Sequence, residues 1–222
     1  MKNYLLVVSI LAALVYWAMR AQIATPFSIF LKGLSIACLA VLAWQQRHSW
    51  QEMLLVVALC FHSVGDVLLD WDRTKLFLPA VGTFMLGHVF YLITFWPNML
   101  ALNALPSSKK LLFGAILLYG LAMAAIIIPH LPKNLFAAVA LYMCVILMMT
   151  LAATSANYRN PWIIVGAILY VISDSLIALD TFVRPLGMSA HLIWPLYYAG
   201  QMLIVTGFLN RNAPAIAWST AR

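Results

Sequence analysis

The sequence predicts an all-α protein, a polytopic membrane bundle of eight transmembrane helices, and two observations lead to that prediction. Of the 222 residues, 65% are hydrophobic and only 9% are charged, whereas a soluble domain carries about 25% charged residues. Eight apolar segments also follow one another along the chain, each close to the roughly 20 residues that a helix needs to cross a bilayer. No polar stretch remains for a water-soluble domain, so residues 1–222 are predicted to form a single integral membrane domain.

The ends of the apolar segments and the positions of proline set the predicted boundaries. Pro26 and Pro161 open segments, as proline does in the first turn of a helix, and several other prolines stand in connections. Pro195 is an exception, because it falls inside the last segment and predicts a kink there. The predicted spans are residues 4–19, 26–44, 51–69, 76–96, 110–128, 134–153, 161–180 and 190–209.

The basic residues predict how the chain sits in the membrane. Lys2 precedes the first apolar segment as in a signal peptide, but no small-x-small cleavage motif follows, so this segment is expected to be retained as a span. Eight spans place both termini on one side. Seven Lys and Arg residues fall on that side and five on the other, a small excess that favours cytoplasmic termini in the cell (inner) membrane.

The formal net charge of +7 does not indicate nucleic-acid binding. The basic residues are scattered singly between the spans, and Lys109-Lys110 is the only doublet. Such spacing is typical of loops that face anionic lipid head groups, whereas a nucleic-acid site needs a basic patch. The expected partners are therefore membrane lipids.

A short internal similarity suggests two four-helix halves. Residues 63–70 in the third span resemble residues 172–177 in the seventh, and each segment contains a Ser and an Asp. Halves with an even number of spans run parallel and are related by an axis along the membrane normal. Such an axis would bring Asp66 and Asp174 towards each other.

Asp66 and Asp174 are the two carboxylates placed well inside spans, since the other four acidic residues lie at or beyond span ends. An ionised carboxylate in hydrocarbon costs at least ~2.5–3.5 kcal/mol, so these groups need a wet cavity or a partner. Lys32 and Tyr197 lie at a similar depth below the same membrane face, about 6–11 Å at ~1.5 Å per residue. His88 and Gln201 lie deeper. Polar residues from five spans therefore converge, as around a cavity.

Two simpler interpretations of these residues remain open. Lys32 can pair with Asp66 or Asp174 only to stabilise the bundle, and His88 can be an internal hydrogen-bond donor. His62 lies one turn before Asp66 and with His88 supplies two of the ligands that zinc needs, but no HExxH-type motif is present. No metal or other cofactor is therefore expected.

These residues resemble the lysoplasmalogenase family of multispanning membrane proteins (the YhhN type). Lys32 matches the intramembrane lysine of the family, although Gly33 stands where the family has proline. Asp70, Asp72 and His62 are not part of the family pattern. The resemblance covers spans two to eight and is carried by Gly65-Asp66-Val67-Leu68-Leu69, by Phe84, Gly87, His88, Tyr91 and Phe95, by residues 166–175 including Ser173-Asp174, and by Tyr197-Tyr198-Ala199-Gly200-Gln201.

The resemblance implies an ether hydrolase that cleaves the alk-1-enyl bond of lysoplasmalogens to a fatty aldehyde and glycerophosphocholine or glycerophosphoethanolamine. Acid cleavage of a vinyl ether needs one carboxylic acid that protonates carbon and one carboxylate that stabilises the cation and activates water, as in a glycosidase. Asp66 and Asp174 suit these catalytic roles, although the sequence does not say which is the acid. Lys32 is expected to hold the phosphate or to bias one aspartate, and the expected substrate-binding residues are His88, Tyr91, Ser173, Tyr197, Tyr198 and Gln201.

Two other functions fit some of the same residues. Intramembrane Asp and Lys together with a proline-broken helix are also typical of proton-coupled transporters of small molecules or lipids. A zinc-dependent lipid amidase would use the histidines. Release of aldehyde by the purified protein in detergent separates a hydrolase from a transporter, and activity that survives a chelator separates it from a zinc enzyme.

Overall fold

The structure is a computed structural model that describes residues 3–19, 26–187 and 189–212. Within these ranges the secondary structure is helical, which confirms the predicted all-α class, and no predicted boundary is more than three residues from the observed one. Short 3₁₀ turns follow α4 and α5, and a π-helical turn, η4 (Leu179–Val183), extends α7. The long helices are α1 (Asn3–Met19), α2 (Pro26–Gln45), α3 (Trp50–Trp71), α4 (Phe77–Phe95), α5 (Ser107–Ile127), α6 (Phe136–Ser155), α7 (Trp162–Ala178) and α8 (Ser189–Leu209).

Seven of the helices, α2 to α8, are long and apolar enough to cross a membrane. The first helix, α1, has 17 residues and is equally apolar. It is shorter than the other seven, although spans of about 17–25 residues occur in proteins. The chain is therefore an integral multi-pass membrane protein.

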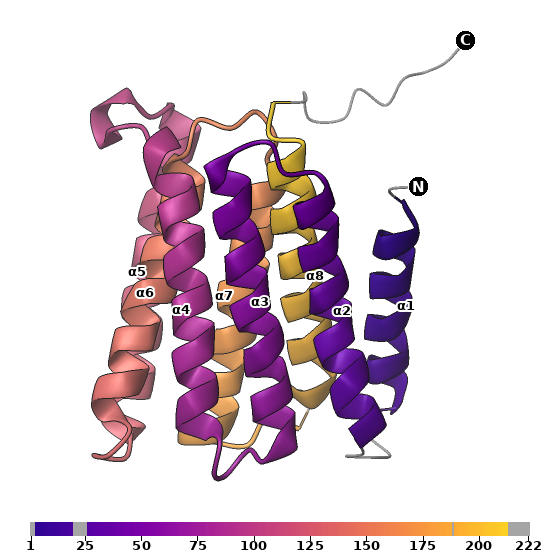
Figure 1. The fold of residues 1–222 in the computed structure, drawn as a ribbon. Helices are drawn as coiled ribbons and strands as arrows, with labels where there is room; N and C mark the ends of the chain where they lie inside the picture. The colour runs from indigo at the N-terminus through magenta and orange to yellow at the C-terminus, as the bar shows by residue number, and fades with distance from the viewer. Residues whose placement is uncertain (1–2, 20–25, 188, 213–222) are drawn as a thin grey trace.

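Successive helices run in opposite directions, so the first turn of α1 and the last turn of α8 lie at the same end of the bundle (Figure 1). We call the opposite end, where α3 ends and α4 begins, the α3–α4 end. Three of the basic residues behind the predicted orientation, Lys2, Arg20 and Arg222, lie outside the described residues.

The packing of the helices repeats after every fourth helix. In the first half α1 packs on α2, α2 on α3 and α3 on α4, and in the second half α5 packs on α6, α6 on α7 and α7 on α8. Between the halves, α4 packs on α6, and α8 packs on α2 and on α1. Exchanging each helix with its counterpart four positions away preserves these contacts except the one between α1 and α8, as expected for two parallel four-helix halves.

Pro195 lies inside α8, and the structure shows how the helix accommodates it. A proline has no N–H, so the carbonyl four residues earlier loses its partner in the helix. Here that carbonyl belongs to His191, and it accepts a hydrogen bond of 3.0 Å from the Trp17 indole of α1. The Trp194 indole likewise donates to the Ala13 carbonyl at 3.0 Å. The cost of the proline is thus offset by contacts that attach α1 to α8.

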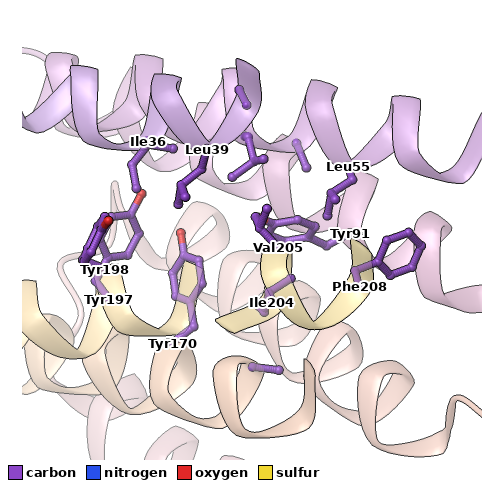
Figure 2. Packing of buried hydrophobic residues seen from close by; sticks show 14 of the residues in the cluster. Ile36, Leu39, Leu55, Tyr91, Tyr170, Tyr197, Tyr198, Ile204, Val205 and Phe208 are labelled. Carbon is purple, nitrogen blue, oxygen red and sulfur yellow. The ribbon is translucent and has the colours of Figure 1, made fainter. Parts of the chain in front are cut away.

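The apolar core lies around α8, where side chains from α1, α2, α3, α4, α6 and α7 pack together with those of α8, and Figure 2 shows part of it. Tyr170, Tyr197 and Tyr198 gather at one end of this row of side chains, and Phe208 lies at the other. Tyrosines pack as aromatic bodies while their hydroxyl groups seek polar partners. This end of the core therefore combines apolar packing with hydrogen bonding.

Two glycines allow α7 and α8 to approach closely. A Cβ atom added to Gly166 would lie 2.6 Å from the Gly200 carbonyl oxygen, and one added to Gly200 would lie 2.9 Å from the Gly166 oxygen. Small residues at such crossings let helix backbones touch in membranes. The contact fixes the position of α8, which carries Tyr197 and Gln201.

We expect Gly166→Val to lower the melting temperature of the protein in detergent. The new side chain has to push the α8 backbone away, and overpacking of this kind typically costs about 1–3 kcal/mol. The matched control is Gly114→Val in α5, where an added Cβ would have no neighbour within 4 Å. Equal melting temperatures for the two variants would contradict this account of the α7–α8 contact.

Candidate functional site

A cavity of about 450 Å³ opens in the half of the bundle nearest the α3–α4 end. All eight long helices contribute to its wall. A site built by every helix can form only once the bundle has assembled. In helix order its polar and aromatic lining includes Tyr16, Lys32, Asp66, Asp70, Phe84, Tyr119, Tyr142, Asp174 and Tyr197.

Lys32 lies between two carboxylates of α3. Its ammonium nitrogen is 2.7 Å from an oxygen of Asp70 and 3.5 Å from an oxygen of Asp66. The side chains of Lys32 and Asp66 are 8% and 3% exposed, so little water screens this ion pair. The Tyr16 hydroxyl donates a hydrogen bond of 2.6 Å to the other oxygen of Asp70. The cation is therefore already compensated by protein carboxylates.

Asp174 has a different environment. It accepts a hydrogen bond from the Tyr142 hydroxyl, and the Nε2 atom of His88 lies 3.1 Å from that hydroxyl and 3.8 Å from Asp174. Among the described residues no lysine or arginine forms an ion pair with Asp174. Its partners are thus a hydroxyl group and an imidazole.

Asp66 is the end of a second chain of hydrogen bonds. The Tyr197 hydroxyl donates to Asp66 at 2.7 Å, and the Gln201 amide nitrogen donates to the Tyr197 oxygen at 3.4 Å. Tyr91 donates in turn to the Gln201 carbonyl oxygen. Gln201 follows Tyr197 by one turn of α8, so both side chains lie on the same helix face. This chain fixes the orientation of the Asp66 carboxylate.

The two aspartates occupy equivalent positions in the two halves. Asp66 on α3 meets Lys32 from α2 and Tyr197 from α8. Asp174 on α7 meets Tyr142 from α6 and His88 from α4. Each carboxylate thus has one partner from the preceding helix of its own half and one from the last helix of the other half. The pattern differs in charge, because the lysine beside Asp66 is replaced by a tyrosine beside Asp174.

The structure brings only some of the predicted site residues to the cavity. Asp66, Asp174, Lys32 and Tyr197 line it. His88, Tyr91 and Gln201 are fully buried behind these residues. His88 lies within hydrogen-bond distance of Tyr142, Gln201 donates to Tyr197, and Tyr91 donates to Gln201.

The two remaining predicted residues, Tyr198 and Ser173, point away from the cavity. The Tyr198 hydroxyl lies 2.7 Å from the Ser9 hydroxyl, on the side of α1 and α2. The Ser173 hydroxyl donates to the Ile193 carbonyl at 2.9 Å and so joins α7 to α8. Tyr198 follows the cavity-lining Tyr197, and Ser173 precedes the cavity-lining Asp174. Because adjacent residues of a helix point about 100° apart, the neighbour of a lining residue points elsewhere.

Sequence reasoning missed Tyr142, Tyr16 and the part played by Asp70. Asp70 had a signal, because it stands four residues after Asp66 and so on the same face of α3. The tyrosines had none, because a tyrosine in an apolar helix looks like any other aromatic core residue.

The histidines do not gather metal ligands around them. The rings of His62 and His88 lie 5.0 Å apart, and His62 packs among Phe84, Tyr91 and Tyr170. Across residues 3–19, 26–187 and 189–212, no group of three or more His, Cys, Asp or Glu side chains is placed to hold a metal ion.

The cavity has a charged part and an apolar part. The carboxylates and Lys32 come from α2, α3, α7 and η4, whereas α5 and α6 contribute residues such as Met123, Met143 and Leu147. An amphipathic molecule with a polar group next to a hydrocarbon chain fits this division. The buried Asp66 and the partly buried Asp174, both facing this cavity, can exchange protons with such a molecule.

Comparisons with known proteins find one matching family and several named relatives. The YhhN family matches residues 27–208. The human protein named lysoplasmalogenase TMEM86B is 30% identical over 189 residues, 85% of this chain and 78% of its own length. A Mycobacterium bovis protein named lysoplasmalogenase is 33% identical over 167 residues, 72% of this chain and 62% of its own length. The Bos taurus lysoplasmalogenase TMEM86A is 30% identical over 168 residues, 72% of this chain and 67% of its own length. No solved structure matches the chain significantly.

Proposed function

Because this chain belongs to the YhhN family, we propose that it is a lysoplasmalogenase-like hydrolase that cleaves the vinyl ether bond of lysoplasmalogens. The products are a fatty aldehyde and glycerophosphocholine or glycerophosphoethanolamine. Relatives that carry the name lysoplasmalogenase support the reaction class. The observation that carries the proposal is that Asp66 and Asp174 line one cavity whose remaining wall is largely apolar.

The reaction can run on two carboxyl groups. A carboxylic acid gives its proton to the vinyl carbon remote from oxygen, which leaves an oxocarbenium ion at the carbon next to oxygen. A carboxylate takes a proton from water as the water oxygen bonds to that carbon, giving a hemiacetal. The second group then protonates the glycerol oxygen while the first accepts the hemiacetal proton. The C–O bond breaks, aldehyde and alcohol leave, and both carboxyl groups return to their starting states.

The surroundings of the two aspartates suit them to different roles in this scheme. Asp66 lies 3.5 Å from the ammonium of Lys32, which suits it to be the carboxylate that stabilises the cation and activates water. Asp174 has neutral hydrogen-bond partners, which suits it to carry the proton to carbon. Tyr142 and Tyr197 would hold the two groups in position.

The other residues in and behind the cavity wall would position the substrate. The hydrocarbon tail would lie against α5 and α6. His88 would act through Tyr142 and Gln201 through Tyr197, and Tyr91 would hold Gln201. The whole chain would act as one membrane domain with both termini in the cytoplasm, in the inner membrane. No cofactor takes part in the scheme.

The experiment that tests the function is a product assay. The purified protein in detergent is given alkenyl, alkyl and acyl lysolipids, and aldehyde, free glycerophospho-base and fatty acid are measured. Release of aldehyde from the alkenyl lipid supports the proposal. A transporter would give no product in detergent, since it needs two compartments.

We expect Lys32→Met to lower the melting temperature strongly, because it leaves the buried Asp66 and the partly buried Asp70 without their cation. Breaking a buried ion pair from one side costs roughly 3–5 kcal/mol. Adding Asp70→Asn should restore much of the lost stability, since one uncompensated carboxylate is then removed. Thermal unfolding of the single and double variants in detergent measures both effects.

The control for this rescue is Asp72→Asn combined with Lys32→Met. Asp72 lies 3.7 Å from the exposed Lys75 and does not contact Lys32. The Asp72→Asn substitution should restore none of the stability that Lys32→Met removes. If Asp70→Asn restores no more stability than Asp72→Asn does, Lys32 has a role other than compensating these carboxylates.

A further inference from the structure

A second cavity, of about 330 Å³, adjoins the first at the α3–α4 end. The two cavities share Arg73, Phe77 and Phe182 as lining residues, so they are neighbours across these side chains. The other lining residues of the second cavity belong to the α3–α4 loop, the start of α4, the loop before α6 and η4. It therefore lies where the bundle meets the membrane surface.

The charges in the two cavities are opposite. The charged residues that line the second cavity are Arg73 and Lys75, and no acidic residue is among the described lining residues, since Asp72, which pairs with Lys75, lies outside the lining. The first cavity contains four aspartates against Lys32 and the shared Arg73. An anionic group would therefore be repelled from the first cavity and attracted to the second.

Arg73 is held where it can meet an anion. Its guanidinium donates a hydrogen bond of 3.2 Å to the Thr181 hydroxyl in η4. In the part of the chain that the structure describes, it forms no ion pair with a carboxylate. An arginine with free donors in a fork binds phosphate well. The Lys75 side chain is 84% exposed and pairs with Asp72, so its contribution is smaller.

The start of α4 provides a second and independent attraction for an anion. Phe77 and Leu78, the first residues of this helix, line the second cavity. The cap residue Leu76 makes no side-chain hydrogen bond to the first turn. The third residue of the helix, Pro79, has no N–H, and the Ala80 N–H donates to the Leu76 carbonyl, so Phe77 and Leu78 supply the free backbone N–H groups. Such groups at an uncapped helix start carry partial positive charge and bind phosphate.

We propose that the second cavity is a phosphate site in which Arg73 and the amino end of α4 bind the phosphate of the lysolipid substrate. The inference rests on the proposed function and deepens it. Lys32, the other basic residue at hand, is already paired with Asp66 and Asp70. Asp66 lies five residues before Trp71, the last residue of α3, which is roughly 7.5 Å along the helix axis, and Arg73 follows two residues later in the loop. A glycerol unit and the arginine side chain together can bridge that length.

The test compares lipids with and without phosphate. Alkenyl lysophosphocholine and alkenylglycerol serve as substrates, and the uncleavable alkyl lysophosphocholine and alkylglycerol serve for binding by calorimetry in detergent. Arg73→Gln should weaken the binding of the phosphocholine lipids at least about tenfold, as expected for losing a charged hydrogen bond. It should leave the binding of the glycerol lipids nearly unchanged. Arg73→Lys should fall between, and Arg184→Gln, an exposed arginine that lines neither cavity, is the matched control.

Two other outcomes would contradict the proposed phosphate site. Equal weakening of both kinds of lipid would show that Arg73 supports the fold, and unchanged binding of the phosphocholine lipid would show that phosphate lies elsewhere. The calorimetric comparison needs no cleavage. A protein that binds phosphocholine lipid through Arg73 but releases no aldehyde would therefore refute the proposed function and keep the phosphate site.

Discussion

Asp66→Asn and Asp174→Asn are each expected to lower turnover of a lysoplasmalogen by at least ~10²-fold, since general acid–base catalysis contributes about 10²–10⁴-fold. Asparagine keeps the size of the side chain and an oxygen that accepts the hydrogen bonds of Tyr197 or Tyr142. It cannot donate or accept the transferred proton. Initial rates of aldehyde release, with melting temperatures measured in parallel, separate lost catalysis from lost folding.

The double variant gives a sharper result than either single one. If the two aspartates act as one unit, removing the second costs little once the first is gone, so the double variant should be about as slow as the slower single variant. Asp72→Asn is the matched control, because Asp72 belongs to the same helix end but lines neither cavity. Normal turnover in either single variant would remove that aspartate from the proposed mechanism.

The eight helices were predictable from the sequence because a bilayer imposes a simple requirement on length and polarity. A span has to remain apolar for about 20 residues, and its backbone bonds are satisfied within the helix. The same requirement makes each buried charge conspicuous. Lys32, Asp66 and Asp174 are therefore recognisable in the sequence as charges inside apolar segments, and all three line the same cavity.

Depth along a helix was predictable, but rotation about its axis was less so. Tyr197 and Tyr198 have nearly the same depth, yet one faces Asp66 and the other faces Ser9. In most of these helices the apolar residues surround the whole circumference, so no polar face indicates which side turns inward. Tyr142 escaped notice for this reason, although its hydroxyl contacts Asp174.

The choice of Lys32 or Arg73 as the partner of phosphate shows what the structure adds. The sequence identified Lys32 as the basic residue within a span, which left phosphate and aspartate as possible partners. Its distances to Asp70 and Asp66 now favour the second. Arg73 looked like an ordinary loop residue, since only the fold places it beside both cavities.

The enzyme is expected to cleave alkenyl lysolipids and to leave the matching alkyl and acyl lysolipids intact. Protonation of carbon needs the double bond of the enol ether, because a saturated alkyl ether cannot form the stabilised cation by that route. An acyl ester would need a nucleophile and an oxyanion hole. The sequence has no Gly-x-Ser-x-Gly motif of the kind that supplies them.

The alkyl and acyl lipids should still bind, because they share the tail and the head group with the substrate. They should act as competitive inhibitors of aldehyde release. Turnover of the alkenyl lipid in deuterated water should be several-fold slower than in ordinary water, because the proposed slow step transfers a proton to carbon. Aldehyde, fatty acid and glycerophospho-base are measured for each lipid in both solvents. Rapid release of fatty acid from the acyl lipid, with no aldehyde from the alkenyl lipid, would refute proton transfer between the two aspartates and a vinyl ether.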